Sequence, residues 1–120
     1  MANARYVSAL FNSREQAHVF HLSTNSYAQH MALQSYYEGI IPLVDSYVEA
    51  YQGTYNKKIR GLRKNSRYVQ DPKKALSYFK GLRKRIRAMK PLASATHLKN
   101  IRDEIMALLT STIYKLQFLK

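Results

Sequence analysis

The 120-residue sequence predicts a single all-α domain built from four helices. Four separate stretches repeat apolar residues at spacings of three and four, which is the periodicity of a helix with one buried face. Apolar residues make up 46% of the chain, enough for a modest core in one domain. The chain contains no cysteine, and this excludes disulfide bonds and thiolate metal sites.

The first predicted helix covers residues 5–24. One face of it carries Val7, Phe11, His18 and Leu22. Inside this stretch, Ser13 and Gln16 stand three residues apart, the spacing of the Gln form of a capping box. This pair predicts that the helix restarts at that point.

The second predicted helix covers residues 26–52. Its apolar side carries Leu33, Tyr37, Ile40, Val44, Tyr47 and Tyr51. Pro42 lies within it, and the proline ring opposes the carbonyl group of Glu38. We therefore expect a kink near Pro42, made easier by the neighbouring Gly39.

The third and fourth helices are predicted at residues 71–90 and 94–118. Asp71 is a suitable N-cap with Pro72 at the first helical position, and Pro91 ends the third helix. The third helix then repeats Ala75, Phe79, Leu82, Ile86 and Met89 at 4-3-4-3 spacing. In the fourth helix, the residues predicted to face the core are Leu98, Ile101, Ile105, Leu108, Leu109, Ile113 and Leu116.

Residues 53–70 form an unusually long connection between the second and third helices. Fully extended, it reaches roughly 60 Å, whereas the second helix is about 40 Å long. The connection can therefore return the chain to the other end of the bundle, so that helices two and three run parallel. One such crossover is the arrangement of a ferritin-like four-helix bundle. The alternative is an up-down-up-down bundle with a loose basic loop.

All of the net charge of +13 arises between residues 57 and 90, which we call the basic segment. It holds fourteen bases and one acid, Asp71: Lys57, Lys58, Arg60, Arg63, Lys64, Arg67, Lys73, Lys74, Lys80, Arg83, Lys84, Arg85, Arg87 and Lys90. Clustered bases of this kind neutralise phosphate groups and release counterions, so we expect nucleic acid as the partner. Tyr55, Tyr68 and Tyr78 lie beside these bases and could stack on nucleotide bases.

Several classes of function find no support in the sequence. No apolar run approaches the roughly 18 residues of a membrane span, and the N-terminus lacks the layout of a signal peptide. We therefore expect a soluble cytoplasmic protein that does not associate with membranes. The sequence contains no glycine-rich phosphate loop and no nucleophile elbow.

Histidines and carboxylates gather in the first half of the chain. His18 and His30 flank the first helix–helix turn, while Asp45 and Glu49 stand one turn apart on the second helix. Imidazole and carboxylate groups together are a ligand set for iron, zinc or manganese. Taken singly, the histidines could equally be hydrogen-bonded core residues and the acids plain surface charges.

The stretch from residue 18 to residue 49 resembles the metal-binding part of the Dps proteins, the mini-ferritins of the bacterial nucleoid. Their pattern is a His, a second His twelve residues later, a carboxylate four residues on, and an Asp-x-x-x-Glu pair. His18, His30, Asp45 and Glu49 match this pattern, whereas Gln34 stands where the intermediate carboxylate belongs. A neutral amide is a poorer ligand for a hard cation, which lowers the expected affinity for metal.

More closely, two stretches resemble small Dps-like proteins encoded by tailed bacteriophages: HVFHLSTNSYAQHMALQSYYEGI and LVDSYVEAYQG. NIRDEI near the C-terminus fits the same group. The resemblance implies a homo-oligomeric shell that binds DNA and oxidises iron, which would make the protein a ferroxidase. For a phage-encoded protein, the location would be the bacterial host cytoplasm or the virion.

Helix geometry adds a constraint on any metal site. His30 and Asp45 are fifteen residues apart on one helix, or about 22 Å, so they cannot bind the same ion within one subunit. A site that uses all four residues therefore requires at least a homodimer.

Three functional hypotheses follow. The first is a Dps-like protein that binds DNA through the basic segment and oxidises iron between subunits. The second is a ferritin-like bundle without metal chemistry that acts as a basic nucleic-acid-binding or virion structural protein. The third is a binder of membrane surfaces or acidic proteins that uses the basic third helix.

Overall fold

Helices make up the regular structure of residues 2–89 and 93–120, the part of the chain that the computed structural model describes. The elements are α1 (Ala2–Ser23), α2 (Tyr27–Tyr55), the short 3-10 helix η1 (Pro72–Lys74), α3 (Ala75–Ala88) and α4 (Thr96–Phe118). No strand occurs among these residues. The predicted all-α class with four main helices is thereby confirmed.

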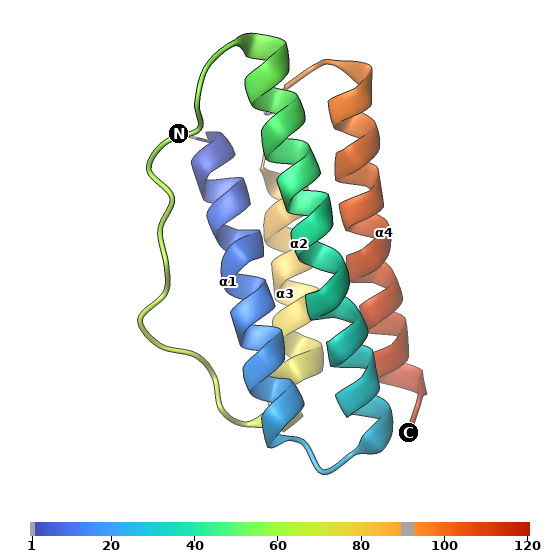
Figure 1. Ribbon diagram of the computed structural model, residues 1–120. Coiled ribbons are helices and arrows are strands. Elements are labelled where there is room, and N and C mark those ends of the chain that lie inside the picture. Colours follow the sequence, from blue (N-terminus) through green and yellow to red (C-terminus); the bar gives the residue numbers. More distant parts are fainter. Residues whose placement is uncertain (1, 90–92) are drawn as a thin grey trace.

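The four helices pack in a ring around one core. α1 contacts α2, α2 contacts α4, α4 contacts α3, and α3 contacts α1. Figure 1 shows α1 and α4 running in one direction and α2 and α3 in the other, so each neighbouring pair is antiparallel. The non-helical residues 56–71, which we call the strap, descend along the outside of α1 from the end of α2 to the start of η1 (Figure 1).

The predicted restart of the first helix is wrong, because α1 is continuous from Ala2 to Ser23. Ser13 is buried in mid-helix, where its hydroxyl donates to the carbonyl of Leu10 (2.7 Å) and bonds to the hydroxyl of Tyr36 (2.6 Å). The predicted apolar face is also partly wrong, since the side chain of Leu22 is 73% exposed. α1 is covered both by the core and by the strap, and a helix buried on two sides does not show a single apolar stripe.

Pro42 does not end α2, which extends three residues beyond its predicted end to Tyr55. Both Pro42 and Glu38 are exposed, so the carbonyl group left without a helical donor lies on the side that faces water. Ser26 caps the start by accepting from the backbone N–H of Gln29 (3.1 Å).

The predicted cap of the third helix is present, but it begins the 3-10 helix η1, and α3 itself starts at Ala75. Asp71 accepts from the backbone N–H of Lys73 (3.0 Å), and Pro72 opens η1. The apolar seam is buried at Ala75, Phe79, Leu82 and Ile86. α3 ends at Ala88, and the predicted stop at Pro91 lies outside the described residues. In α4, the predicted inward positions Leu98, Ile105, Leu109 and Ile113 are buried.

The Ser13–Tyr36 contact predicts an asymmetric effect of mutation. Ser13→Ala leaves the fully buried hydroxyl of Tyr36 without a partner, which costs about 1–3 kcal/mol of unfolding free energy. Tyr36→Phe costs less, because Ser13 keeps its bond to Leu10. Urea unfolding of both variants checks the order, and an equal or reversed loss would contradict it.

Candidate nucleic-acid interface

The upper part of the strap is bound to α1 by buried polar side chains. The backbone N–H of Arg63 donates to the hydroxyl of Ser8 (2.9 Å), and the amide of Asn12 donates to the carbonyl of Arg63 (3.0 Å). The other side of the same amide accepts from the backbone N–H of Asn65 (2.8 Å). Ser8 and Asn12 are each 8% exposed, so α1 supplies the strap with partners that a neighbouring strand would otherwise provide.

The lower part of the strap is held in the same way one helical turn further along α1. The amide of Gln16, itself 3% exposed, donates to the carbonyl of Val69 (2.7 Å) and accepts from its N–H (2.8 Å). Where the strap leaves α2, the N–H of Ile59 donates to the amide oxygen of Gln52 (2.9 Å). The strap is therefore hydrogen-bonded to the bundle at several points between residues 59 and 69.

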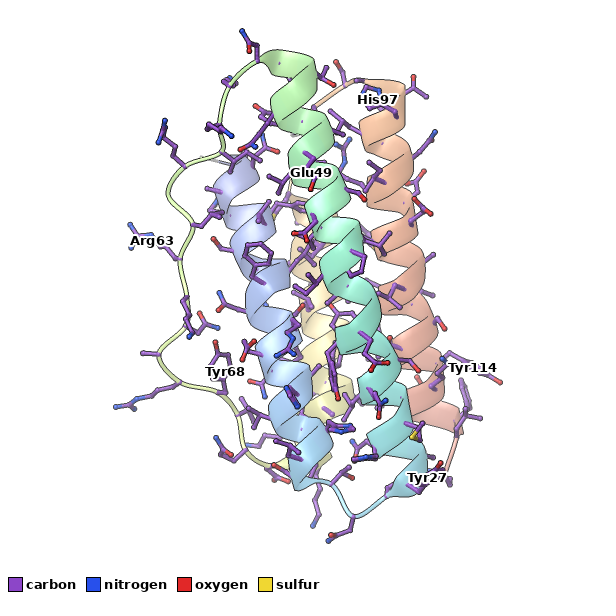
Figure 2. All side chains as sticks on the ribbon, viewed as in Figure 1. Tyr27, Glu49, Arg63, Tyr68, His97 and Tyr114 are labelled. Atoms are coloured by element: carbon purple, nitrogen blue, oxygen red, sulfur yellow. The ribbon has the colours of Figure 1, made fainter. Side chains whose placement is uncertain are left out.

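Anchoring through the backbone leaves the basic side chains of the strap free to face solvent. All six are exposed: Lys57, Lys58, Arg60, Arg63, Lys64 and Arg67. In η1 and α3, six more are exposed and Arg83 is half-buried: Lys73, Lys74, Lys80, Lys84, Arg85 and Arg87. Lys90 lies outside the described residues. Figure 2 shows Arg63 pointing away from the bundle.

The positive charge of this surface is not neutralised within the protein. Across residues 2–89 and 93–120, the ion pair present joins Arg14 to Glu15 (2.8 Å), and neither belongs to the basic segment. Three of the acids, Glu38, Asp45 and Glu49, are exposed on α2 instead. Because exposed bases without carboxylate partners keep their full charge, the strap and the exposed side of α3 are each strongly positive.

The three tyrosines beside the bases make contacts within the fold. Tyr78 packs its ring against Phe20 and Phe79, with centroids 5.9 and 5.1 Å away, and burial raises the pKa of Tyr78 to about 12. Tyr68 is half-buried and donates its hydroxyl to Asn12 (3.3 Å). Tyr55 packs against Tyr51, with centroids 4.9 Å apart. The rings of Tyr68 and Tyr78 are thus held by contacts within the fold.

The structure brings three histidines together at the α1–α2 turn. The rings of His21 and His30 stack with centroids 3.5 Å apart. Each ring donates from Nδ1 to the backbone carbonyl of the other residue (2.8 and 2.9 Å). His18 stacks on Tyr37 (4.5 Å), and its Nδ1 lies 3.3 Å from the guanidinium of Arg14. These contacts give the histidines a structural role in joining α1 to α2.

The two carboxylates matched to the metal motif do not join this cluster. Asp45 and Glu49 are exposed on α2, and Figure 2 shows Glu49 far along α2 from Tyr27, where that helix begins. The amide of Gln34 donates to Glu38 instead (3.4 Å). No group of three histidine or acidic side chains in the described ranges converges to hold a metal ion.

The residues that anchor the strap were missed by sequence analysis. Ser8, Asn12 and Gln16 repeat at a spacing of four, which places them on one face of a helix. A polar stripe beside an apolar one would normally indicate a face in water. Here the stripe extends over three turns, and each of its side chains can both donate and accept hydrogen bonds. This pattern could have predicted that the stripe binds the backbone of another segment.

These features define a class: a four-helix protein whose basic surface lies on an anchored strap and on one helix. Residues 21–116 match the family model described as "Family of unknown function (DUF5856)", and the chain therefore belongs to this family. No curated protein and no solved structure matches the chain. Within the described ranges, each helix is too short or too polar to cross a membrane.

Proposed function

We propose that this protein binds nucleic acid, and DNA in particular, through phosphate contacts made by the basic segment. The proposal is supported by the thirteen described bases of the basic segment, none of which forms an ion pair with another described residue. Contacts to phosphate oxygens position a protein without reading sequence, so we propose binding with little sequence preference.

The anchored strap favours such binding energetically. Arg60, Arg63 and Arg67 are spaced three and four residues apart on a non-helical chain, or roughly 10–14 Å. α3 presents its own exposed bases along a helix of about 21 Å. Because the strap backbone is already ordered by α1, binding does not have to order it. A double strand, with one charge per about 1.7 Å of axis, suits a wide surface of fixed cations.

Salt dependence tests the proposal. About six phosphate contacts give a slope of log affinity against log salt near −5. The affinity for two labelled duplexes of unrelated sequence, measured by fluorescence anisotropy, should therefore fall steeply and equally as the salt concentration rises. A flat salt dependence, or a large preference for one duplex, would contradict phosphate recognition.

We further propose that the bundle is ferritin-like and Dps-like and that it forms a homo-oligomer. The parallel course of α2 and α3, joined by the strap, supports this arrangement (Figure 1). A basic surface repeated in an oligomer would also gain avidity for a long polyanion. Native mass spectrometry tests the assembly, and a protein that stays monomeric at micromolar concentration would contradict it.

Iron oxidation between subunits is the second candidate function. The histidines at the α1–α2 turn and the exposed Asp45 and Glu49 favour it. In a homo-oligomer, the two carboxylates of one subunit could lie next to the histidines of another. We expect His30→Ala to remove iron-dependent oxygen consumption and to leave duplex binding intact. His97→Ala is the matched control, since exposed His97 bonds to Thr54 at the opposite end of α2. Equal activity of both variants would overturn this function.

A further inference from the structure

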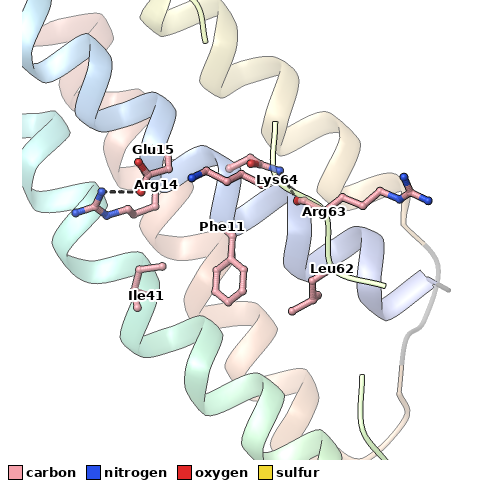
Figure 3. Close-up of a pocket in the computed structure, with 8 residues that line it drawn as sticks. Phe11, Arg14, Glu15, Ile41, Leu62, Arg63 and Lys64 are labelled. Carbon is pink, nitrogen blue, oxygen red and sulfur yellow. Dashed lines mark hydrogen bonds and ion pairs between the residues drawn. The ribbon is translucent and has the colours of Figure 1, made fainter. Parts of the chain in front are cut away.

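A groove lies between α1, α2 and the strap. Phe11 of α1 and Ile41 of α2 line one side, and Leu62 of the strap lines the other. Figure 3 shows the ring of Phe11 directed into the space between Ile41 and Leu62. The volume is about 450 Å³, within the range of sites that bind a small ligand or a few side chains.

The position of Leu62 is imposed by the strap rather than by packing. Its side chain is 47% exposed, although it is apolar and lies among exposed bases. The next residue, Arg63, is held through both its N–H and its carbonyl by Ser8 and Asn12. With the peptide units on both sides of Arg63 held, the strap keeps Leu62 at the mouth of the groove, where it remains available to an apolar group from outside.

The rim of the groove is positively charged. Arg63 and Lys64 are exposed and have no carboxylate partner in the described part of the chain, whereas the one acid at the rim, Glu15, already pairs with Arg14 (2.8 Å). Phosphate groups would be attracted by this rim, but they carry no apolar group that could pack against the floor of the groove. A ligand that carries carboxylates on both sides of an apolar side chain complements floor and rim together.

We propose that this groove binds a segment of a partner protein in which one apolar side chain is flanked by acidic residues. The apolar side chain enters between Phe11 and Leu62, and a flanking carboxylate meets Lys64, whose side chain extends over the groove toward Arg14 (Figure 3). The site is distinct in kind from the phosphate-binding surface, because it depends on Leu62 as well as on charge.

Fluorescence anisotropy with a short labelled peptide tests this proposal. The peptide has one central leucine flanked by glutamates, and two comparison peptides replace either the leucine by serine or the glutamates by glutamines. We expect each comparison peptide to bind at least about tenfold more weakly, since burial of a leucine or loss of the charge contacts accounts for that much affinity. Binding of the serine peptide with unchanged affinity would overturn the proposal, as would no binding at all.

Leu62→Ser is the informative protein variant, because an exposed side chain can be replaced without opening the core. We expect it to weaken binding of the leucine peptide about tenfold. Leu22→Ser, at the far end of α1 and 73% exposed, is the matched control and should leave the affinity unchanged. Duplex binding should not depend on Leu62. If Leu62→Ser weakens duplex and peptide binding alike, the groove belongs to a nucleic-acid site and the proposal fails.

Discussion

Replacing Arg60, Arg63 and Arg67 together by glutamine is expected to weaken duplex binding about 10- to 100-fold and to make the salt slope about three units less steep. Each arginine is exposed and without a carboxylate partner, so each is available for one phosphate contact. The fold should tolerate the change, because Arg63 is anchored through its backbone and not through its guanidinium. Anisotropy titrations at several salt concentrations measure both quantities.

The control for this variant removes the same charge elsewhere. Lys99, Lys115 and Lys120 lie outside the basic segment, and their replacement by glutamine also lowers the net charge by three. We expect this control to change affinity only slightly and to retain the salt slope. An equal loss in both triple variants would mean that net charge, rather than the strap, determines binding.

Asn12→Ala combined with Gln16→Ala is expected to lower the free energy of unfolding by about 3 kcal/mol, equivalent to roughly 10 °C in Tm. The two amides make the bonds that hold the backbone of Arg63, Asn65 and Val69. Their loss detaches the strap, so trypsin should cleave it at the exposed bases. Duplex affinity should also fall, although no base has been removed, because the strap must then be ordered on binding.

A matched double variant separates anchoring from general effects. Asn100→Ala with Gln117→Ala makes the same chemical changes at exposed positions of α4. We expect the stability and protease resistance of this variant to equal those of the parent protein. If the Asn12 and Gln16 variant resists trypsin equally well, the strap is held by other contacts and its ordering does not contribute to binding.

The helices could be predicted from local sequence because their signals are local. The Asp71–Pro72 start appears in the structure at η1, and the predicted seam is buried at Ala75, Phe79, Leu82 and Ile86, whereas Met89 lies beyond the end of α3. Capping and burial of one helical face need no knowledge of distant residues. The concentration of charge between residues 57 and 90 is likewise a property of the sequence alone. These features were sufficient for the fold class and for the choice of a polyanion as the proposed partner.

The sites of contact between distant segments could not be predicted in this way. Nothing near Asn12 in the sequence indicates Arg63 and Asn65, which lie more than fifty residues away and meet it only when the strap returns along α1. As it runs back along α1, the strap also buries the polar stripe of this helix, which the sequence alone would place in contact with water. The local sequence therefore determined the helices and the position of the charge. Tertiary packing decided which polar side chains are buried and where the bases point, because a backbone without strand or helix partners must find its hydrogen bonds elsewhere.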